Sequence, residues 1–513
     1  MADTNPDFVK ALRNVDYFAE QASGLRLRAY QVAPARAIAE SVLYRKGMTF
    51  VVMFPRQSGK NELQAQLETY LLISLAFTNQ EIVKVSPTWK PQSLNAMRRL
   101  ERVIKRNLFA RYIRWKKTSG YIFQVGSATI TFLSGSPTSS VVGATASLLL
   151  ECDEAQDVGI EKWDKEFAPM AASTNATRVF WGTAWTSRTL LARELRAALA
   201  AQEQDGQQRV FIMDADQVAQ EVPAYGAFVR DQVARMGRNH PFIRTQYYAE
   251  EIDSEGALFD ARRLALMRGE HAACEQPVAG RAYAFLLDIA GEEEAEGLSV
   301  VEAQLNKSRD STALTVVEID LSSLEDELIQ APTYRVVNRL EWVGVKHTKI
   351  YGLVKAMVQQ WDPAYLVIDA TGVGAGLASF LEKAYPHKVI QFVFSPKSKS
   401  DLGWNFLAVI ETGRYKEYSQ ADKNEAHGRL ANLQRVFFQQ AAACQQQVME
   451  GPGKTLRWGV PDGTRDQNTG ELVHDDLLIS AAMCSVLDDK DFGLAESEVI
   501  QSHDPLAGMK DVY

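Results

Sequence analysis

A Gly-Lys pair near residue 60 stands where an apolar run gives way to a helical pattern. The segment TFVVMFPRQSGKNELQAQLETYLL predicts a buried strand, a short polar turn that holds Gly59 and Lys60, and a helix. In this setting the backbone N–H groups at the helix start bind phosphate oxygens, and the lysine reaches the terminal phosphates. Phe54 replaces the usual first glycine of such a loop, and Asn61 replaces the Ser or Thr that ligates Mg²⁺. We expect Asn61 to act through its amide oxygen, directly or through a metal-bound water. The alternative is that Asn61 only caps the helix.

Two further strand ends supply the rest of an ATP-hydrolysing site. SLLLECDEAQD is an apolar run that ends in Asp153 and Glu154. This is the Walker B arrangement, in which the Asp holds Mg²⁺ and the Glu orients the attacking water. The alternative for this pair is a buried strand followed by two helix-capping acids. A later run, RVFWGTAWTSR, ends in Gly182 and Thr183 and places a hydroxyl at a sheet edge.

Carboxylates also end apolar runs in the second half of the chain. Asp288 ends AFLLDIAG, Asp369 ends YLVIDATGVG, and Asp475 and Asp476 open HDDLLISAAMCSVL. Hydrolysis of a phosphodiester by two metal ions about 4 Å apart needs such a cluster. Each acid by itself could be a turn or capping residue. Of the late pair we favour Asp476, because the apolar residues that follow it are spaced to face a core, with Asp475 as a second ligand.

Two features near these carboxylates, Asp310 and the glycines after Asp369, are interpreted separately. Asp310, just before STALTVVEID, is a candidate supporting acid. The glycines after Asp369 are spaced G-x-G-x-G rather than G-x-G-x-x-G, and a carboxylate beside a pyrophosphate would repel it. A dinucleotide site is therefore rejected.

The elements that must position these residues form two α/β blocks. In the first, strand-like runs at 50–54, 81–86, 121–132, 147–152 and 177–183 alternate with helical stretches, which is typical of a mostly parallel sheet. In the second, three strands are followed by a helix and a strand, which is the order of the RNase H-like fold. The predicted domains are an ATPase domain at 1–255 with a helical lid at about 187–255, a linker at 256–280, an RNase H-like domain at 281–490 and a flexible tail at 491–513.

Composition limits the class of protein. The 513 residues suffice for two or three domains, and 46% hydrophobic with 23% charged residues is ordinary for a globular protein. The net charge of −8 argues against a passive DNA-coating protein. Basic clusters at 98–106 and 111–117 have helical spacing and are either solvated faces or a phosphate track. The four cysteines are too scattered for a disulfide framework or a zinc site. Since neither a membrane span nor a signal peptide is recognisable, we expect a cytosolic protein.

The motifs FPRQSGKNE, LLLECDEAQD and GTAWTS together resemble the Walker A, Walker B and coupling motifs of the large subunits of viral (tailed bacteriophage) DNA-packaging terminases. The resemblance implies that Arg56 touches or senses the γ-phosphate and that Thr183 couples hydrolysis to movement. RLRAYQ resembles the adenine-reading segment of that family, with Gln31 on the base. The nucleotide-binding set is then Gln31, Arg56, Gln57, Ser58, Gly59, Lys60, Asn61, Asp153 and Thr183. The carboxylate pattern resembles that of the terminase nuclease and covers the whole second block.

This resemblance implies an ATP-driven motor that cuts concatemeric viral DNA and pumps it into a procapsid. Its cofactors would be ATP and Mg²⁺, with Mn²⁺ as an alternative in the nuclease site. Its partners would be double-stranded DNA, the portal of the procapsid, a small terminase subunit and further copies in a ring, in the host cytoplasm and without a membrane. Two alternatives stay open: a helicase-like ATPase with a non-catalytic RNase H-like domain, and a recombination nuclease with an N-terminal scaffold.

Overall fold

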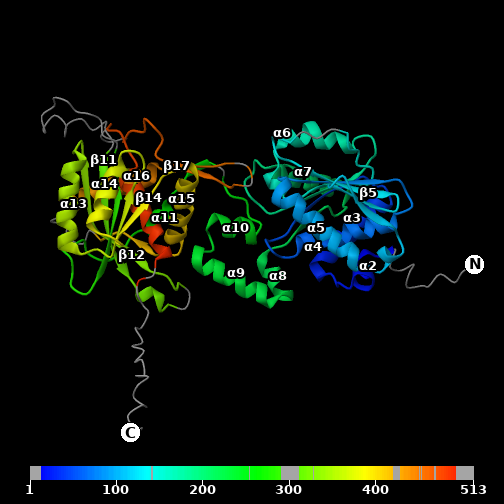
Figure 1. Cartoon of the computed structure of the whole chain (residues 1–513), viewed down its shortest axis with the longest axis horizontal. Helices are drawn as coiled ribbons and strands as arrows, with labels where there is room; N and C mark the ends of the chain where they lie inside the picture. The colour runs from blue at the N-terminus through cyan, green and yellow to red at the C-terminus, as the bar shows by residue number, and fades with distance from the viewer. Residues whose placement is uncertain are drawn as a thin grey trace, which may run out of the picture.

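The chain forms two α/β lobes joined by a helical segment (Figure 1). Helices α8 (Ala215–Glu221), α9 (Pro223–Met236) and α10 (Pro241–Tyr247) lie between the lobes. The computed structural model describes residues 13–139, 143–253, 255–290, 311–326, 329–419, 428–449, 451, 453–466, 470–490 and 492. None of the helices in these ranges combines the length and the apolar character that a membrane crossing needs.

The N-terminal lobe is built on an eight-stranded sheet in the order β3-β4-β5-β2-β6-β7-β1-β8. The six strands from β5 to β8 are parallel, and β3 and β4 add an antiparallel edge. The strands are β1 (Thr49–Met53), β2 (Glu81–Ser86), β3 (Trp115–Thr118), β4 (Ile122–Val125), β5 (Ala128–Ser134), β6 (Leu149–Cys152), β7 (Thr177–Gly182) and β8 (Val210–Ile212).

Both faces of this sheet are covered, which explains why its strands are apolar throughout. Phe50 and Val52 belong to the core on the face of helices α2 (Val15–Ser23), α3 (Ala29–Leu43), α4 (Lys60–Ser74) and α5 (Leu94–Arg106). Val51 and Met53 belong to the core on the other face, against α7 (Leu190–Asp205). The two-residue period of β1 thus divides its side chains between two cores.

The C-terminal lobe contains a six-stranded mixed sheet in the order β14-β13-β10-β11-β12-β15. β10, β11 and β12 form an antiparallel meander, and β13 joins β10 in parallel. Helices α13 (His347–Trp361) and α14 (Gly374–Ala384) cover one face, and α15 (Pro396–Glu411), α16 (Arg429–Ala443) and α17 (Asp476–Ala482) cover the other. The strands are β10 (Ala282–Asp288), β11 (Ser311–Asp320), β12 (Thr333–Val343), β13 (Tyr365–Asp369), β14 (Val389–Phe392) and β15 (Tyr415–Lys416).

The predicted fold class is confirmed: an N-terminal P-loop-type domain with a largely parallel sheet precedes an RNase H-like domain. Three details differ from expectation. The run 121–132 is the β4–β5 hairpin, which turns at Gly126. Part of the predicted lid, α7 and β8, belongs to the N-terminal sheet and its helical layer. The cluster at 111–117 lies largely in β3 and its approach, whereas the one at 98–106 is helical in α5.

The segment predicted as a linker, 256–280, carries regular structure. β9 (Glu255–Ala257) pairs with β16 (Gln445–Val448), which also pairs with β17 (Leu456–Gly459) in a small antiparallel sheet. α11 (Ala261–Leu266) packs against α15 and α16. The segment is thus attached to the C-terminal lobe through backbone hydrogen bonds. The local sequence pattern does not predict this pairing, because β9 and β16 are far apart in the chain. Asp310 and, except for Phe492, the predicted tail lie outside the described residues.

Candidate functional site

The turn after β1 has the shape of a phosphate-binding loop. Gln57 and Gly59 adopt left-handed backbone angles, with φ of 64° and 96°, and α4 begins directly afterwards at Lys60. The turn is held from behind, because the Ser58 carbonyl accepts hydrogen bonds from Tyr30 Oη (2.5 Å) and Arg28 Nη1 (3.0 Å). The free backbone N–H groups at the start of α4 therefore face a cavity of about 840 Å³. That volume suits a nucleotide.

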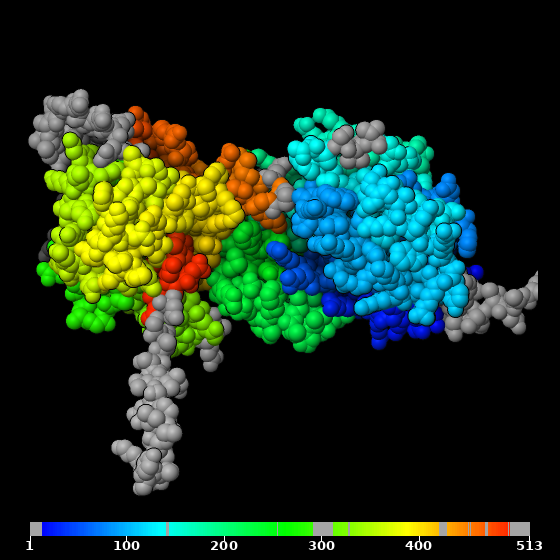
Figure 2. Space-filling view, viewed as in Figure 1, coloured from blue at the N-terminus to red at the C-terminus, as the bar shows by residue number. Residues whose placement is uncertain are grey.

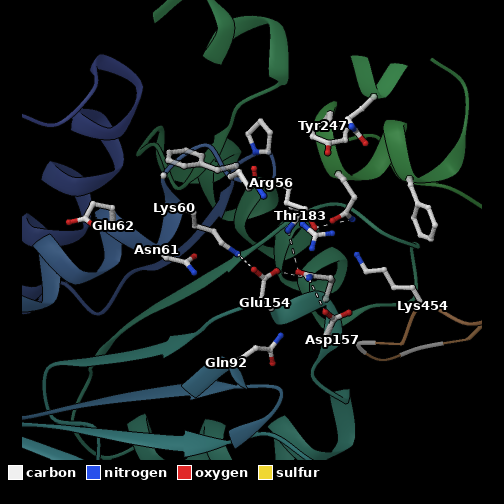
Figure 3. A pocket seen from close by; sticks show the side chains of 18 of the residues that line it. Arg56, Lys60, Asn61, Glu62, Gln92, Glu154, Asp157, Thr183, Tyr247 and Lys454 are labelled. Atoms are coloured by element: carbon white, nitrogen blue, oxygen red, sulfur yellow. Dashed lines mark hydrogen bonds and ion pairs between the residues drawn. The ribbon is translucent and has the colours of Figure 1, made fainter. Parts of the chain in front are cut away.

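Lys60 meets both acids that follow β6. Its Nζ lies 2.6 Å from Glu154 Oε1 and 3.4 Å from Asp153 Oδ1. Figure 3 shows the contact between Lys60 and Glu154. Burial alone would lower the pKa of Lys60, but Glu154 and Asp153 outweigh it and raise this pKa. Burial alone would raise the pKa of Asp153, but Lys60 and Lys84 outweigh it and lower this pKa. Lys60 and Asp153 are therefore both charged at neutral pH.

A buried charge network lies behind this site. Lys84 of β2 donates to Glu68 Oε1 (2.5 Å) and Gln64 Oε1 (3.0 Å), and Gln64 Nε2 donates to Asp153 Oδ1 (3.0 Å). Glu151 of β6 lies 3.7 Å from Lys84, and burial together with Glu68 raises its pKa to about 8. Because every member is buried, the network fixes the orientation of Asp153.

Gln156 connects Glu154 to Thr183. Its Nε2 donates to Glu154 Oε2 (2.8 Å), and its Oε1 accepts from the Thr183 backbone N–H (3.2 Å). A Cβ on Gly182 would lie 2.2 Å from this Oε1, so the close approach requires glycine. Thr183 Oγ1 accepts from Gln246 Nε2 of α10 (3.4 Å). The three strand-end motifs thus meet around one cavity, as the sequence predicted.

The remaining predicted nucleotide residues fall into two groups. Arg56, Gln57 and Asn61 line the cavity. The Ser58 hydroxyl instead donates to the Pro55 carbonyl (2.7 Å). The amide of Gln31 is engaged at both ends: Oε1 accepts from the Arg28 backbone N–H (3.0 Å), and Nε2 donates to the Gly59 carbonyl (3.1 Å). In this arrangement Gln31 supports the loop from behind, and its contact with adenine stays a prediction.

In the C-terminal lobe, Asp288 and Asp369 end neighbouring parallel strands. Leu287 of β10 pairs with Ile368 of β13, so the next residue of each strand reaches the same edge of the sheet. Asp369 Oδ1 accepts from the Thr371 backbone N–H (2.8 Å). Burial raises the pKa of Asp369.

Asp476 joins this edge from the first turn of α17. Its Oδ2 accepts from the backbone N–H (2.9 Å) and the hydroxyl (2.6 Å) of Ser311, the first residue of β11. Burial raises the pKa of Asp476 to about 6. The apolar residues that follow in α17 are buried, as the sequence predicted. Asp475 is more exposed and lies 3.8 Å from Lys399 Nζ.

The other three acids act electrostatically on Asp288. Burial raises the pKa of Asp288 well above its ordinary value, and Asp476, Asp369 and Asp475 raise it further. Repulsion of this kind is relieved by a cation, so the donor chemistry suits a divalent metal. The spacing does not: within the described ranges, no three His, Cys, Asp or Glu side chains are close enough together to hold a metal ion. The metal set therefore stays a prediction.

Comparison with known proteins bears on both lobes. Residues 304–426 match the family model of the terminase RNaseH-like domain. A segment of 89 residues is 25% identical to the "probable terminase, ATPase subunit" of Haemophilus phage HP1. The predicted resemblance to terminase large subunits is confirmed. The HP1 match covers 17% of this chain and 14% of that protein. The activity, substrates and partners of the whole protein are therefore proposals.

Among solved structures, the chain is similar to the large terminase of bacteriophage HK97, with 13% identity, a TM-score of 0.41 and coverage of 93% of this chain and 99% of that one. It is also similar to the large terminase of a thermophilic bacteriophage, with 12% identity, a TM-score of 0.44 and coverage of 89% of this chain and 98% of that one.

Several residues at these sites were not anticipated from the sequence. Gln156 stands two positions after Glu154, so the Walker B segment itself could have suggested it. Lys84 interrupts an apolar strand, and a lone lysine in a buried strand signals a buried partner. Ser311 lies at the carboxylate edge, and Lys454 lines the cavity beside the P-loop-like turn. Neither residue carries a local signal, because only tertiary packing brings it to its site.

Proposed function

We propose that this chain is an ATP-driven DNA-packaging motor and a metal-dependent DNA endonuclease. One observation supports this above all: one chain contains both a P-loop-like turn with an acid pair and a carboxylate edge. Asp369 of that edge lies in the segment that matches the terminase RNaseH-like domain. The first suits ATP hydrolysis, and the second suits phosphodiester hydrolysis.

In the proposed ATPase reaction, the phosphates of ATP take Lys60 away from Glu154. Glu154 is then free to orient the attacking water, and Gln156 holds its second oxygen. Asp153, kept ionised by Lys60 and Lys84, is the residue that would hold Mg²⁺, which neutralises charge on the phosphates when bound. Because Gln156 also binds the Thr183 backbone, a movement of Glu154 is transmitted to the segment after β7.

In the proposed nuclease, Asp288, Asp369 and Asp476 are the residues that would hold the metal ions once brought closer together, with Asp475 as an additional ligand. Ser311 orients Asp476 through two hydrogen bonds to one oxygen, which leaves the other available to a cation. Mg²⁺ or Mn²⁺ would supply the charge that activates water and stabilises the leaving oxygen.

The same proposal specifies the partners. The substrate is concatemeric double-stranded viral DNA. The chain works as a ring of copies on the portal of a procapsid, together with a small terminase subunit, in the host cytoplasm. The basic residues of α5 are candidates for contacting the DNA backbone.

One purified preparation tests the proposal. Wild-type protein is incubated with plasmid and Mg²⁺ or Mn²⁺ while ATP hydrolysis is measured in parallel. We expect both activities, with cleavage abolished by EDTA. Absence of ATP hydrolysis would contradict the proposed motor function. Absence of cleavage with either metal would contradict the proposed nuclease function.

A second candidate is a DNA-remodelling ATPase whose RNase H-like lobe does not cut. It is favoured by one observation, that no three of the described potential ligands are spaced to hold a metal. ATP hydrolysis stimulated by DNA, without metal-dependent cleavage, would support it over the first.

A further inference from the structure

One wall of the nucleotide cavity comes from the other lobe. Gly453 and Lys454, in the connection between β16 and β17 of the C-terminal lobe, line the cavity together with the P-loop and the Walker B segment. Figure 2 shows this part of the chain, in orange, lying against the N-terminal lobe. In Figure 3 the side chain of Lys454 points into the cavity from the side opposite Lys60 and Asn61.

The backbone at Lys454 is held in an unusual conformation. Its φ of 45° lies in the left-handed region, which costs a residue with a Cβ about 1 kcal/mol or more. The Lys454 N–H donates to the Gly451 carbonyl (3.2 Å), and the Lys454 carbonyl accepts from Trp404 Nε1 of α15 (3.2 Å). The connection is closed by Met449 N–H, which donates to the Thr455 carbonyl (2.8 Å). These contacts direct the side chain towards the cavity.

The Lys454 ammonium lies over an aromatic ring. Its Nζ lies 4.6 Å from the centre of the Trp185 ring. Asp157 and Glu154 are the acids whose charges act on it most, yet within the described part of the chain neither forms an ion pair with it. Burial lowers the pKa of Lys454. A half-buried lysine that contacts an aromatic face in a polar cavity is suited to an anionic ligand.

Trp185 links this lysine to the rest of the site. It follows Thr183 by two residues and belongs to the core of the C-terminal lobe, where it stacks on Phe242 and packs near Trp404. The same Trp404 binds the Lys454 carbonyl. The segment from Thr183 to Trp185 and Lys454 are therefore attached to one aromatic cluster, which contains Trp404.

We propose that Lys454 binds the terminal phosphate of ATP in this cavity, so that the C-terminal lobe supplies a cation to the nucleotide site of its own chain. The inference rests on the proposed ATPase function. The P-loop and the start of α4 surround the phosphates from one side, and Lys454 approaches from the side of Glu154, where the terminal phosphate is attacked. ADP lacks that phosphate, so the contact distinguishes the two nucleotides and makes the attachment between the lobes depend on which is bound.

The test compares full-length wild type with Lys454→Met, Lys454→Arg and a matched control, Lys383→Met, at an exposed position in α14. Dissociation constants for ATP-γ-S and ADP are measured by calorimetry with Mg²⁺ present. We expect Lys454→Met to weaken ATP-γ-S binding roughly 10-fold or more and ADP binding less than about twofold, since a charged hydrogen bond is lost only with the triphosphate. Lys454→Arg should retain most of the preference, and Lys383→Met all of it.

Each outcome decides the matter. Equal ATP-γ-S affinity in Lys454→Met and wild type would overturn the inference. An equal loss of affinity for ATP-γ-S and for ADP would also overturn it, because it would indicate a structural role of Lys454. Thermal unfolding at the same temperature as wild type confirms that the variant is folded. If wild type binds ATP-γ-S but does not hydrolyse ATP, the proposed function fails while the comparison still decides about Lys454. If wild type binds neither nucleotide, both proposals fail.

Discussion

The ammonium nitrogen of Lys60 lies 2.6 Å from Oε1 of Glu154, so the lysine of the P-loop is paired with the acid proposed to orient water. In this pairing neither group is available for its part in hydrolysis. In the proposed reaction ATP must therefore separate Lys60 from Glu154.

Glu154→Gln should bind nucleotide about as well as wild type but hydrolyse it at least about 100-fold more slowly. Glutamine keeps the shape and can still interact with Gln156, but it lacks the charge that positions the water. ATP turnover and ATP-γ-S affinity are measured on the same preparation. Glu161→Gln, at an exposed acid, is the control. Near-normal turnover in Glu154→Gln would contradict the Walker B assignment.

Asp476→Asn and Asp288→Asn should each abolish plasmid cleavage and leave ATP hydrolysis near wild type. Asparagine at 476 can still accept from Ser311, so the fold should be kept while the charge for a cation is lost. Asp362→Asn is the matched control, because it changes an exposed acid at the opposite end of β13. Normal cleavage by Asp288→Asn would show that the carboxylate edge is not the nuclease site.

Asn61→Ala should raise the Mg²⁺ concentration that gives half-maximal ATP hydrolysis, by roughly 10-fold if the amide oxygen binds a metal-bound water. Asn61→Thr should stay close to wild type because it offers a hydroxyl. Asn61 lines the cavity, and the N-cap of α4 is Gly59, so the alternative capping role has no support from the helix start. An unchanged midpoint in Asn61→Ala would nevertheless rule out a metal-binding role.

Lys84→Met should destabilise the N-terminal lobe by about 3 kcal/mol or more. Its removal leaves Glu68 and Glu151 facing each other in the core without a cation. Unfolding by denaturant, followed by tryptophan fluorescence, measures the loss. A triple variant with Lys84→Met, Glu68→Gln and Glu151→Gln should recover part of it, because no buried charge then lacks a partner. Equal stability of Lys84→Met and wild type would contradict the proposed role of the network.

Acid should weaken the attachment between the lobes through His240. Burial lowers the pKa of this histidine from 6.5 to about 4. Its Nδ1 accepts from the Phe242 backbone N–H (3.2 Å), and its Nε2 lies 3.1 Å from the Trp404 carbonyl, so the fold requires the neutral ring. The unfolded chain takes up a proton below about pH 6.5, whereas the folded chain does so only near pH 4.

The stability that His240 contributes is therefore complete above about pH 6.5 and falls by roughly 3 kcal/mol as the pH drops to about 4. His240→Asn keeps a side chain that can cap α10 but does not titrate. Denaturant unfolding between about pH 4 and 7 should show a shallower acid loss in the variant. Identical pH profiles would refute this assignment.

Much of the candidate nucleotide site could be predicted from the sequence because the residue pattern that forms it is local. Gly59 and Lys60 follow an apolar strand and open a helix, and Asp153 and Glu154 follow another. Parallel strands place their carboxyl ends at one edge of a sheet, so contiguous segments already determine where these side chains meet. The parallel register of β10 and β13 places Asp288 beside Asp369 for the same reason.

Only the tertiary structure could decide how distant segments complete these sites. The pairing of Lys84 with Glu68, the turn of the Gln31 amide towards Gly59 and the approach of Lys454 to the nucleotide cavity depend on how whole elements pack. The physical reason is the range of the interactions: hydrophobic periodicity and turn chemistry act between near neighbours in the chain, whereas a buried charge finds its partner only after sheets and helices have enclosed it. The sequence by itself thus determined which side chains stand at each strand end. Tertiary packing decided which distant residues contact and orient those side chains.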